Sequence, residues 1–155
     1  MCMRKMCIGI LAIVYMGILT GCIGQEESFM LTDIVFCTGE PSNRSYEQNF
    51  DHRYVRGDIL WVYLECFKFE PMVDNGTYVA VFDATLEIFD DAGTCIESGS
   101  QIIEVPTTAH PGYVWLKFWI STDTMKEGTY TLKITVKDTV SHEQATSQGE
   151  YFITA

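Results

Sequence analysis

The sequence predicts an all-β protein, an antiparallel β-sandwich of seven or eight strands that follows an N-terminal signal segment. Beyond residue 30, apolar and polar residues alternate with a period of two, and β-branched and aromatic residues dominate these runs. Clusters of Gly, Asn, Asp and Pro separate the runs, and the 3.6-residue period of an amphipathic helix is almost absent. Many strands without helices favour two packed sheets. The predicted strands cover residues 31–37, 58–69, 78–89, 94–97, 101–105, 112–121, 128–138 and 147–154.

The N-terminus has the three parts of an export signal. Arg4 and Lys5 precede an apolar run over residues 8–19, and the run closes in Leu19-Thr20-Gly21-Cys22. The run is about 12 residues long, which suits the apolar part of a signal peptide and is shorter than the ~18 residues of a membrane-spanning helix. An ordinary secretory signal and an uncleaved anchor helix that continues to Ile23 are the alternatives.

This order of features resembles the signal peptide of prokaryotic (bacterial or archaeal) membrane lipoproteins, in which the cysteine of the lipobox is the first mature residue. The resemblance implies that residues 1–21 are removed and that the Cys22 thiol carries a diacylglycerol. Residues 22–30 then form a tether, and residues 31–155 form the β-sandwich domain. Two acyl chains hold a protein firmly at a bilayer, so we expect the domain on the extracytoplasmic face of the cell membrane.

Residues 39–57 are expected to form the longest irregular stretch, since apolar residues are few and turn formers are frequent. The stretch ends in Arg56-Gly57-Asp58, which is typical of a turn before a strand. Loops of this length often carry function. Two glycosylation sequons, at Asn43 and Asn75, predict surface positions for both asparagines.

The strand predicted at 58–69 has two unlike faces, and so has the strand at 112–121. One face of each is aliphatic. The other faces carry Trp61, Tyr63, Glu65, Phe67 and Phe69 on the first strand and Tyr113, Trp115, Lys117 and Trp119 on the second. A core does not accommodate Glu65 and Lys117, so these aromatic faces should point outward. In a shared sheet they would form a platform for a protein or for stacked sugar rings, with Trp61, Tyr63, Tyr113, Trp115 and Trp119 as the binding surface. Alternatively, the 39–57 stretch covers them.

The later strands are defined by their alternation and their turns. In 78–89, Ala80, Phe82 and Ala84 share one face, and the segment Asp90–Thr94 is typical of a tight hairpin in which Gly93 takes a positive φ. Residues 128–138 alternate most regularly. Their opening, Lys126 to Tyr130, and the return strand at 147–154 resemble the end of immunoglobulin-like domains. The resemblance implies that Tyr130 ties its strand to the preceding loop.

Composition and motifs exclude several functions. All acidic residues follow Cys22 in a chain of net charge −11, so binding to nucleic acid is not expected. The histidines (His52, His110, His142) and the cysteines lack the paired spacing of a zinc site, and no metal or cofactor is expected. Of the cysteines beyond Cys22, namely Cys37, Cys66 and Cys95, one pair or none forms a disulfide.

The absence of catalytic motifs favours a non-catalytic protein. A distant pair such as Cys37 or Cys66 with His52 stays open as an alternative. We therefore expect a lipid-anchored binding module whose partner is a protein or a glycan, bound through the aromatic face or the 39–57 stretch. A protease inhibitor that uses Pro41 and Arg44, or an accessory subunit of an envelope complex, are the other candidates.

Overall fold

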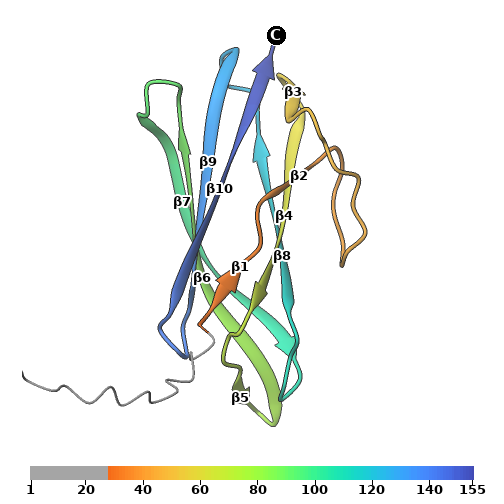
Figure 1. Ribbon diagram of the computed structural model, residues 1–155, viewed down its shortest axis with the longest axis vertical. Coiled ribbons are helices and arrows are strands. Elements are labelled where there is room, and N and C mark those ends of the chain that lie inside the picture. Colours follow the sequence, from red (N-terminus) through yellow and green to blue (C-terminus); the bar gives the residue numbers. More distant parts are fainter. Residues whose placement is uncertain (1–27) are drawn as a thin grey trace, which may run out of the picture.

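The structure is a computed structural model that describes residues 28–155; the expected signal segment and Cys22 lie outside them. The described residues form ten strands and no helix, arranged in two sheets, so the predicted all-β sandwich is confirmed (Figure 1). The strands are β1 (Met30–Leu31), β2 (Val35–Cys37), β3 (Arg53–Val55), β4 (Ile59–Phe67), β5 (Met72–Asp74), β6 (Thr77–Phe89), β7 (Cys95–Thr107), β8 (Val114–Ser121), β9 (Gly128–Asp138) and β10 (Gln144–Thr154).

The two sheets differ in width. In the smaller sheet, β4 pairs with β1, β2 and β8. In the larger sheet, the path β3-β10-β9-β6-β5 is extended by β7, which also pairs with β6. Every pair is antiparallel except that of β3 with β10, which is parallel. This parallel pair is the one exception to the predicted antiparallel arrangement among the described strands, because the chain crosses between the sheets before β3.

Several strand boundaries differ from the prediction for physical reasons. The segment 31–37 is two short strands that pair with opposite ends of β4, and Thr32 lies between them, its Oγ1 accepting the Glu65 N–H at 2.9 Å. The two strands predicted at 94–97 and 101–105 are one strand, β7, because backbone pairing with β6 runs through Ser98-Gly99-Ser100 without apolar side chains. The short strands β3 and β5 were not predicted.

The core lies between the two sheets, where the predicted aliphatic faces meet. Leu60, Val62 and Leu64 of β4 are fully buried, and so are Phe82 and Ala84 of β6. Packing begins at Phe29: its ring lies 6.0 Å from that of Phe82, and its N–H donates to Glu143 Oε2 at 2.8 Å. The residue that precedes β1 is therefore part of the folded domain.

Phe69 corrects one expectation about the aromatic face. We expected it to point outward with Trp61, but it is buried and meets the ring of Phe82 edge-on at 5.4 Å. The strand ends at Phe67, and Lys68 takes a left-handed backbone with φ of 59°. Because this conformation breaks the alternation of a strand, the next side chain turns inward.

Two predicted local features are confirmed. The Tyr130 hydroxyl donates to the Lys126 carbonyl at 2.9 Å, the corner that the immunoglobulin-like resemblance implies. In the β6–β7 hairpin, Asp90 Oδ1 accepts the backbone N–H groups of Ala92 and Thr94 at 3.0 and 2.8 Å, and Gly93 has a φ of 77°. Both depend on groups that are close in sequence.

We predict that Gly149→Ala destabilises the domain. A Cβ at this position would lie 2.8 Å from Cε2 of Phe36, a fully buried ring that also packs against Tyr151. Overpacking of this kind costs about 1–3 kcal/mol of unfolding free energy, which urea denaturation would measure. Phe36→Leu removes the ring that the added Cβ would meet. The double variant Phe36→Leu/Gly149→Ala should therefore regain part of the unfolding free energy that Gly149→Ala loses. A Gly149→Ala variant as stable as the parent would contradict this account of the close approach.

Candidate functional site

The predicted aromatic residues gather on the outer face of the smaller sheet. Strands β4 and β8 pair so that Trp61 lies opposite Trp119 and Glu65 opposite Trp115, which confirms that the two strands share a sheet. The side chains between them point into the core, so the aromatic ones point away from it. We call this set the aromatic face: Trp61, Tyr63, Tyr113, Trp115 and Trp119.

A segment that we call the strap, residues 38–52, covers the middle of the aromatic face. It runs beside β4 as it leads from β2 to β3 (Figure 1). Tyr46 of the strap packs on Tyr63 with ring centroids 4.7 Å apart, and only 2% of Tyr63 is exposed. The covered arrangement, which the sequence left as an alternative, therefore applies to the centre of the face.

An ion pair holds the strap on the sheet. The Arg44 guanidinium donates to both oxygens of Glu65, from Nε to Oε1 at 2.8 Å and from Nη2 to Oε2 at 3.0 Å. The same guanidinium lies 3.9 Å above the Tyr113 ring, and the Tyr63 hydroxyl donates to Glu65 Oε1 at 2.7 Å. The Arg44 hydrogen bonds hold the pKa of the Glu65 carboxyl below its usual value, although burial opposes them. This explains how a glutamate occupies a buried position on an aromatic face.

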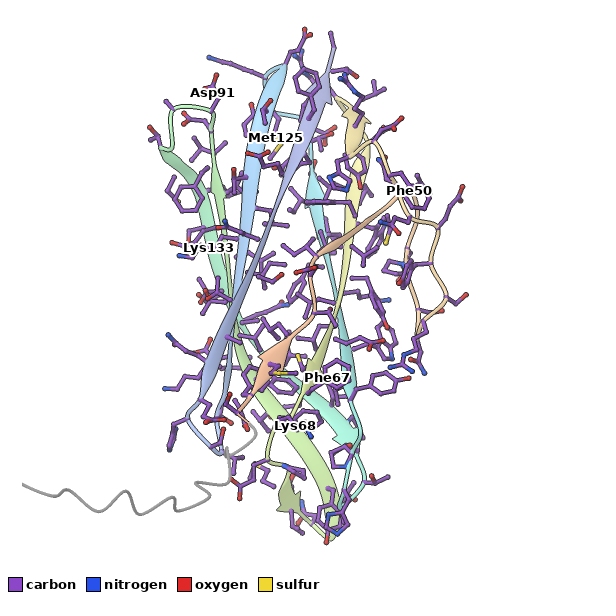
Figure 2. The ribbon with its side chains drawn as sticks, in the orientation of Figure 1. Phe50, Phe67, Lys68, Asp91, Met125 and Lys133 are labelled. Atoms are coloured by element: carbon purple, nitrogen blue, oxygen red, sulfur yellow. The ribbon has the colours of Figure 1, made fainter. Side chains whose placement is uncertain are left out.

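Two further contacts join the strap to β8 and to the residue before it. Glu40 forms an ion pair with Lys117, and Asn43 Oδ1 accepts the Tyr113 hydroxyl at 2.7 Å. Phe50, by contrast, is 80% exposed on the strap (Figure 2). Asn43 and Asn75 are both exposed, as the sequons predict; their glycosylation stays a prediction.

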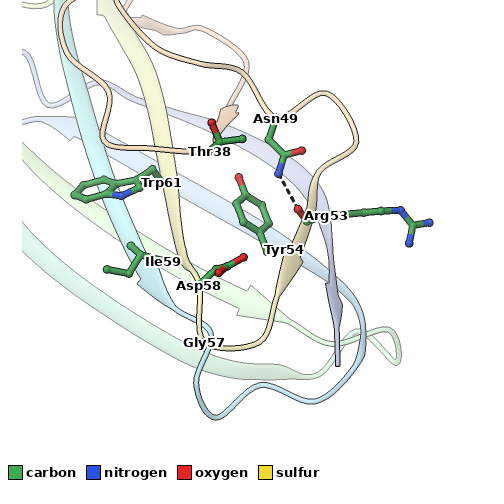
Figure 3. A pocket seen from close by; sticks show the side chains of 8 residues that line it. All are labelled: Thr38, Asn49, Arg53, Tyr54, Gly57, Asp58, Ile59 and Trp61. Atoms are coloured by element: carbon green, nitrogen blue, oxygen red, sulfur yellow. Dashed lines mark hydrogen bonds between the residues drawn. The ribbon is translucent and has the colours of Figure 1, made fainter.

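One end of the aromatic face stays open. Trp119 is 63% exposed, and Trp61, its cross-strand neighbour, is half-buried on the wall of a cleft of about 430 Å³ (Figure 3). The cleft is lined by Thr38, Asn49, Arg53, Tyr54, Gly57, Asp58, Ile59 and Trp61. Its residues come from the strap, from β3 and from the start of β4. The open end thus combines an indole surface with amide, hydroxyl and carboxylate groups.

Contacts within the cleft fix its polar groups in place. Asn49 Nδ2 donates to the Arg53 carbonyl at 2.8 Å, as the dashed line in Figure 3 marks, and the Tyr54 hydroxyl donates to the Cys37 carbonyl at 2.9 Å. Asp58 Oδ2 accepts the Val55 N–H at 3.0 Å. Each of these groups keeps further hydrogen-bonding capacity, because an amide oxygen and a carboxylate have several acceptor positions.

The Arg56-Gly57-Asp58 turn contributes Gly57 and Asp58 to the lining of the cleft and is structural. Arg56 Nε donates to the Met125 carbonyl at 2.8 Å, and the Gly57 N–H donates to the buried Thr122 hydroxyl at 3.0 Å. Gly57 has a φ of 98°, a conformation that favours glycine. The predicted turn before a strand is confirmed.

Within the described residues, Cys37 and His52 each contact the backbone carbonyl of another residue. Cys37, Cys66 and Cys95 are free thiols; burial raises the pKa of Cys37 to about 11 and that of Cys66 to about 12, so both are protonated at neutral pH. His52 Nδ1 lies 2.9 Å from the Glu150 carbonyl, and its ring packs on Phe36. Within residues 28–155, no group of three or more His, Cys, Asp or Glu residues is placed to hold a metal ion.

Comparison with protein-family models and with curated proteins finds no match to this chain. Among residues 28–155, no helix is long and apolar enough to cross a membrane.

Proposed function

We propose that this protein is a non-catalytic carbohydrate-binding module, tethered to the outer face of a cell membrane by a lipid on Cys22. The observation that carries the proposal is the pairing of exposed Trp119 with Trp61 at the mouth of a polar cleft. Trp61 and Trp119 come from neighbouring strands of a rigid sheet, so their spacing does not depend on a ligand.

The chemistry of the cleft matches a sugar. A pyranose has an apolar C–H face, which packs on an indole, and a rim of hydroxyl groups, which need oriented donors and acceptors. Asn49, Asp58 and Thr38 supply such groups in the cleft that Trp61 also lines. A standard protein interface needs about 800 Å² from each partner. The strap buries Tyr63 in the centre of the aromatic face, so the open remainder favours a small ligand.

The position of the cleft suits a tethered receptor. Phe29, near the start of the described residues, donates its N–H to Glu143 beside the β9–β10 turn, whereas the N–H of Arg56, next to the cleft residue Gly57, donates to the Thr154 carbonyl at the other end of β10. These ends lie at opposite ends of the sandwich (Figure 1). Eleven residues of antiparallel strand span roughly 35 Å. A tether that precedes Phe29 therefore leaves the cleft facing away from the bilayer.

The strap geometry gives less support to a protease inhibitor. Such an inhibitor presents an extended loop to an active site, but the Arg44 guanidinium is bound to Glu65 and stacked on Tyr113. The acidic chain also disfavours anionic sugars. We therefore expect neutral or amino-sugar oligosaccharides as ligands.

We predict that Trp119→Ala and Trp61→Ala weaken oligosaccharide binding by at least about tenfold, since each removes a stacking surface. The measurement is binding of the domain to immobilised neutral, amino-sugar and acidic oligosaccharides, followed by calorimetry with the best ligand. Trp115→Ala is the matched control, because Trp115 lies at the far end of the aromatic face and packs on Tyr63.

Two results would contradict the proposal. Retention of no oligosaccharide by the parent protein would exclude sugar binding, and an equal loss in all three tryptophan variants would mean a general loss of structure. Mass spectrometry of the membrane-extracted protein tests the tether separately: an intact N-terminus, without a lipid mass on Cys22, would contradict it.

A further inference from the structure

A second surface lies on the side of the sandwich where β7 and β8 form the edges of their sheets. Strand β7 is 13 residues long and pairs with β6 along almost all of them, and within residues 28–155 no strand pairs with its other side. Residues 95–102 of β7 are all exposed, including Ile96 at 49% and Ile102 at 60%. A long exposed edge of this kind is a template for another strand.

The opposite side of the sandwich is covered by the strap, apart from the proposed sugar cleft at one end. There the strap leads from one sheet to the other, and Cys37 and Gln48 pair in an isolated antiparallel β-bridge. The Phe36 ring fills the space beside Gly149. The edge strand β3 has only three residues. Between β7 and β8, in contrast, runs a cleft of about 510 Å³, lined by residues 101–105 and by Trp115, Leu116 and Lys117. The sandwich is thus open along its longest free edge.

Pro106 indicates which backbone groups of β7 point to the free edge. Proline has no N–H, so in a sheet it is tolerated where that position faces away from the partner strand. The Thr85 and Ser100 hydroxyls lie 2.8 Å apart across β6 and β7, as expected for a closely spaced pair that does not exchange backbone hydrogen bonds. By this parity the N–H groups of Ser98, Ser100, Ile102 and Glu104 face the free edge, whereas those of Gln101 and Ile103 face β6.

The charge of the edge defines the partner. Strand β7 carries Glu97 and Glu104 and no Lys or Arg, and Lys117 on the β8 side of the cleft is paired with Glu40. A second copy of this acidic chain would place like charges across the new pair, which is destabilising. An extended segment with basic residues would meet these carboxylates favourably. The occupant is therefore a different chain with positive charge.

We propose that β7 accepts an extended, cationic segment of a partner protein by β-strand addition. The segment continues the larger sheet beyond β7 and alternates two kinds of side chain. Its apolar side chains face the cleft, next to Ile103, Val105 and Trp115, and its Lys or Arg side chains lie on the outer face beside Glu104. This site is separate from the proposed sugar cleft, so either proposal can fail without the other.

The first test uses an acetylated peptide of alternating lysine and valine, about seven residues long, as the probe. NMR hydrogen exchange on the full domain should give new protection at the amides of Ser98, Ser100, Ile102 and Glu104. The amides of Gln101 and Ile103, already bonded to β6, should change little. Saturating peptide without new protection at these four amides would overturn the proposal.

Variants separate strand addition from charge attraction. Ile102→Pro removes one edge N–H, and Glu104→Lys reverses one charge; each should weaken peptide binding by at least about tenfold. Asp91→Lys, at the exposed tip of the β6–β7 hairpin, is the control for charge and should bind almost normally. A peptide of the same sequence with N-methylated backbone amides keeps the charge but loses the N–H groups that face β7 in either strand direction, and should bind weakly. Equal binding of both peptides, or of all three variants, would overturn the proposal.

Discussion

Replacement of Asp138 by alanine is expected to lower the free energy of unfolding by about 3 kcal/mol. The side chain is fully buried at the end of β9. Its Oδ2 accepts the Glu70 N–H at 2.7 Å and the Ser141 hydroxyl at 2.8 Å, and its Oδ1 accepts the Val140 N–H at 3.0 Å. Alanine would leave two backbone N–H groups without this acceptor, and each buried unsatisfied group costs about 1–3 kcal/mol.

Urea denaturation of three variants would measure this effect. Asp138→Asn keeps an acceptor for part of the network and should lose less stability than Asp138→Ala. Ser141→Ala removes one side-chain donor and should have the smallest effect. If Asp138→Ala lost less than Ser141→Ala, the carboxylate would not be the centre of this network, and the connection between the β9–β10 turn and Glu70 would need another explanation.

Acidification is expected to detach the strap from the aromatic face before the sandwich unfolds. The Arg44 hydrogen bonds lower the pKa of Glu65 from its ordinary value of 4.5. The carboxylate therefore stabilises the closed strap fully above about pH 4.5, and this contribution is lost as the pH falls through the lower value of the folded protein. Tyr63 donates to the same carboxylate.

At neutral pH, Glu65→Gln should make the strap open about tenfold more often. The substitution removes the negative charge from a bidentate pair with Arg44, and the exposure of the Arg44 side chain limits the size of the effect. Hydrogen exchange at strap amides would measure opening, and NMR shifts of Arg44 would follow the acid transition. Glu40→Gln is the matched control, because its exposed ion pair should contribute less. An acid transition that persists unchanged in Glu65→Gln would assign it to another group.

The parts of the fold that could be predicted from the sequence depend on local patterns. The alternation in β4 and β8 indicates their core faces, because each inward position is apolar. The Tyr130 corner and the Asp90 turn join groups a few residues apart. Local spacing is therefore enough for strands and turns, and for placing the aromatic residues on one face.

The parts that could not be predicted depend on distant contacts. Glu65 is polar and so indicated a solvated face, yet Arg44, 21 residues earlier, neutralises it under the strap. Asn49 and Asp58 line the cleft only because the chain passes from one sheet to the other through β3. The continuity of β7 depends on its long partner β6 and not on its own side chains.

The placement of Phe29 and Trp119 at opposite ends of the smaller sheet has a mechanical consequence. A membrane tether would pull on Phe29, and a bound ligand would pull on the end of β8 near Trp119. This load runs along β1, β4 and β8, whose interstrand hydrogen bonds lie across the direction of pull. The bonds are then strained together in shear and do not open one after another. With the proposed tether and ligand in place, the domain would resist stretching between them.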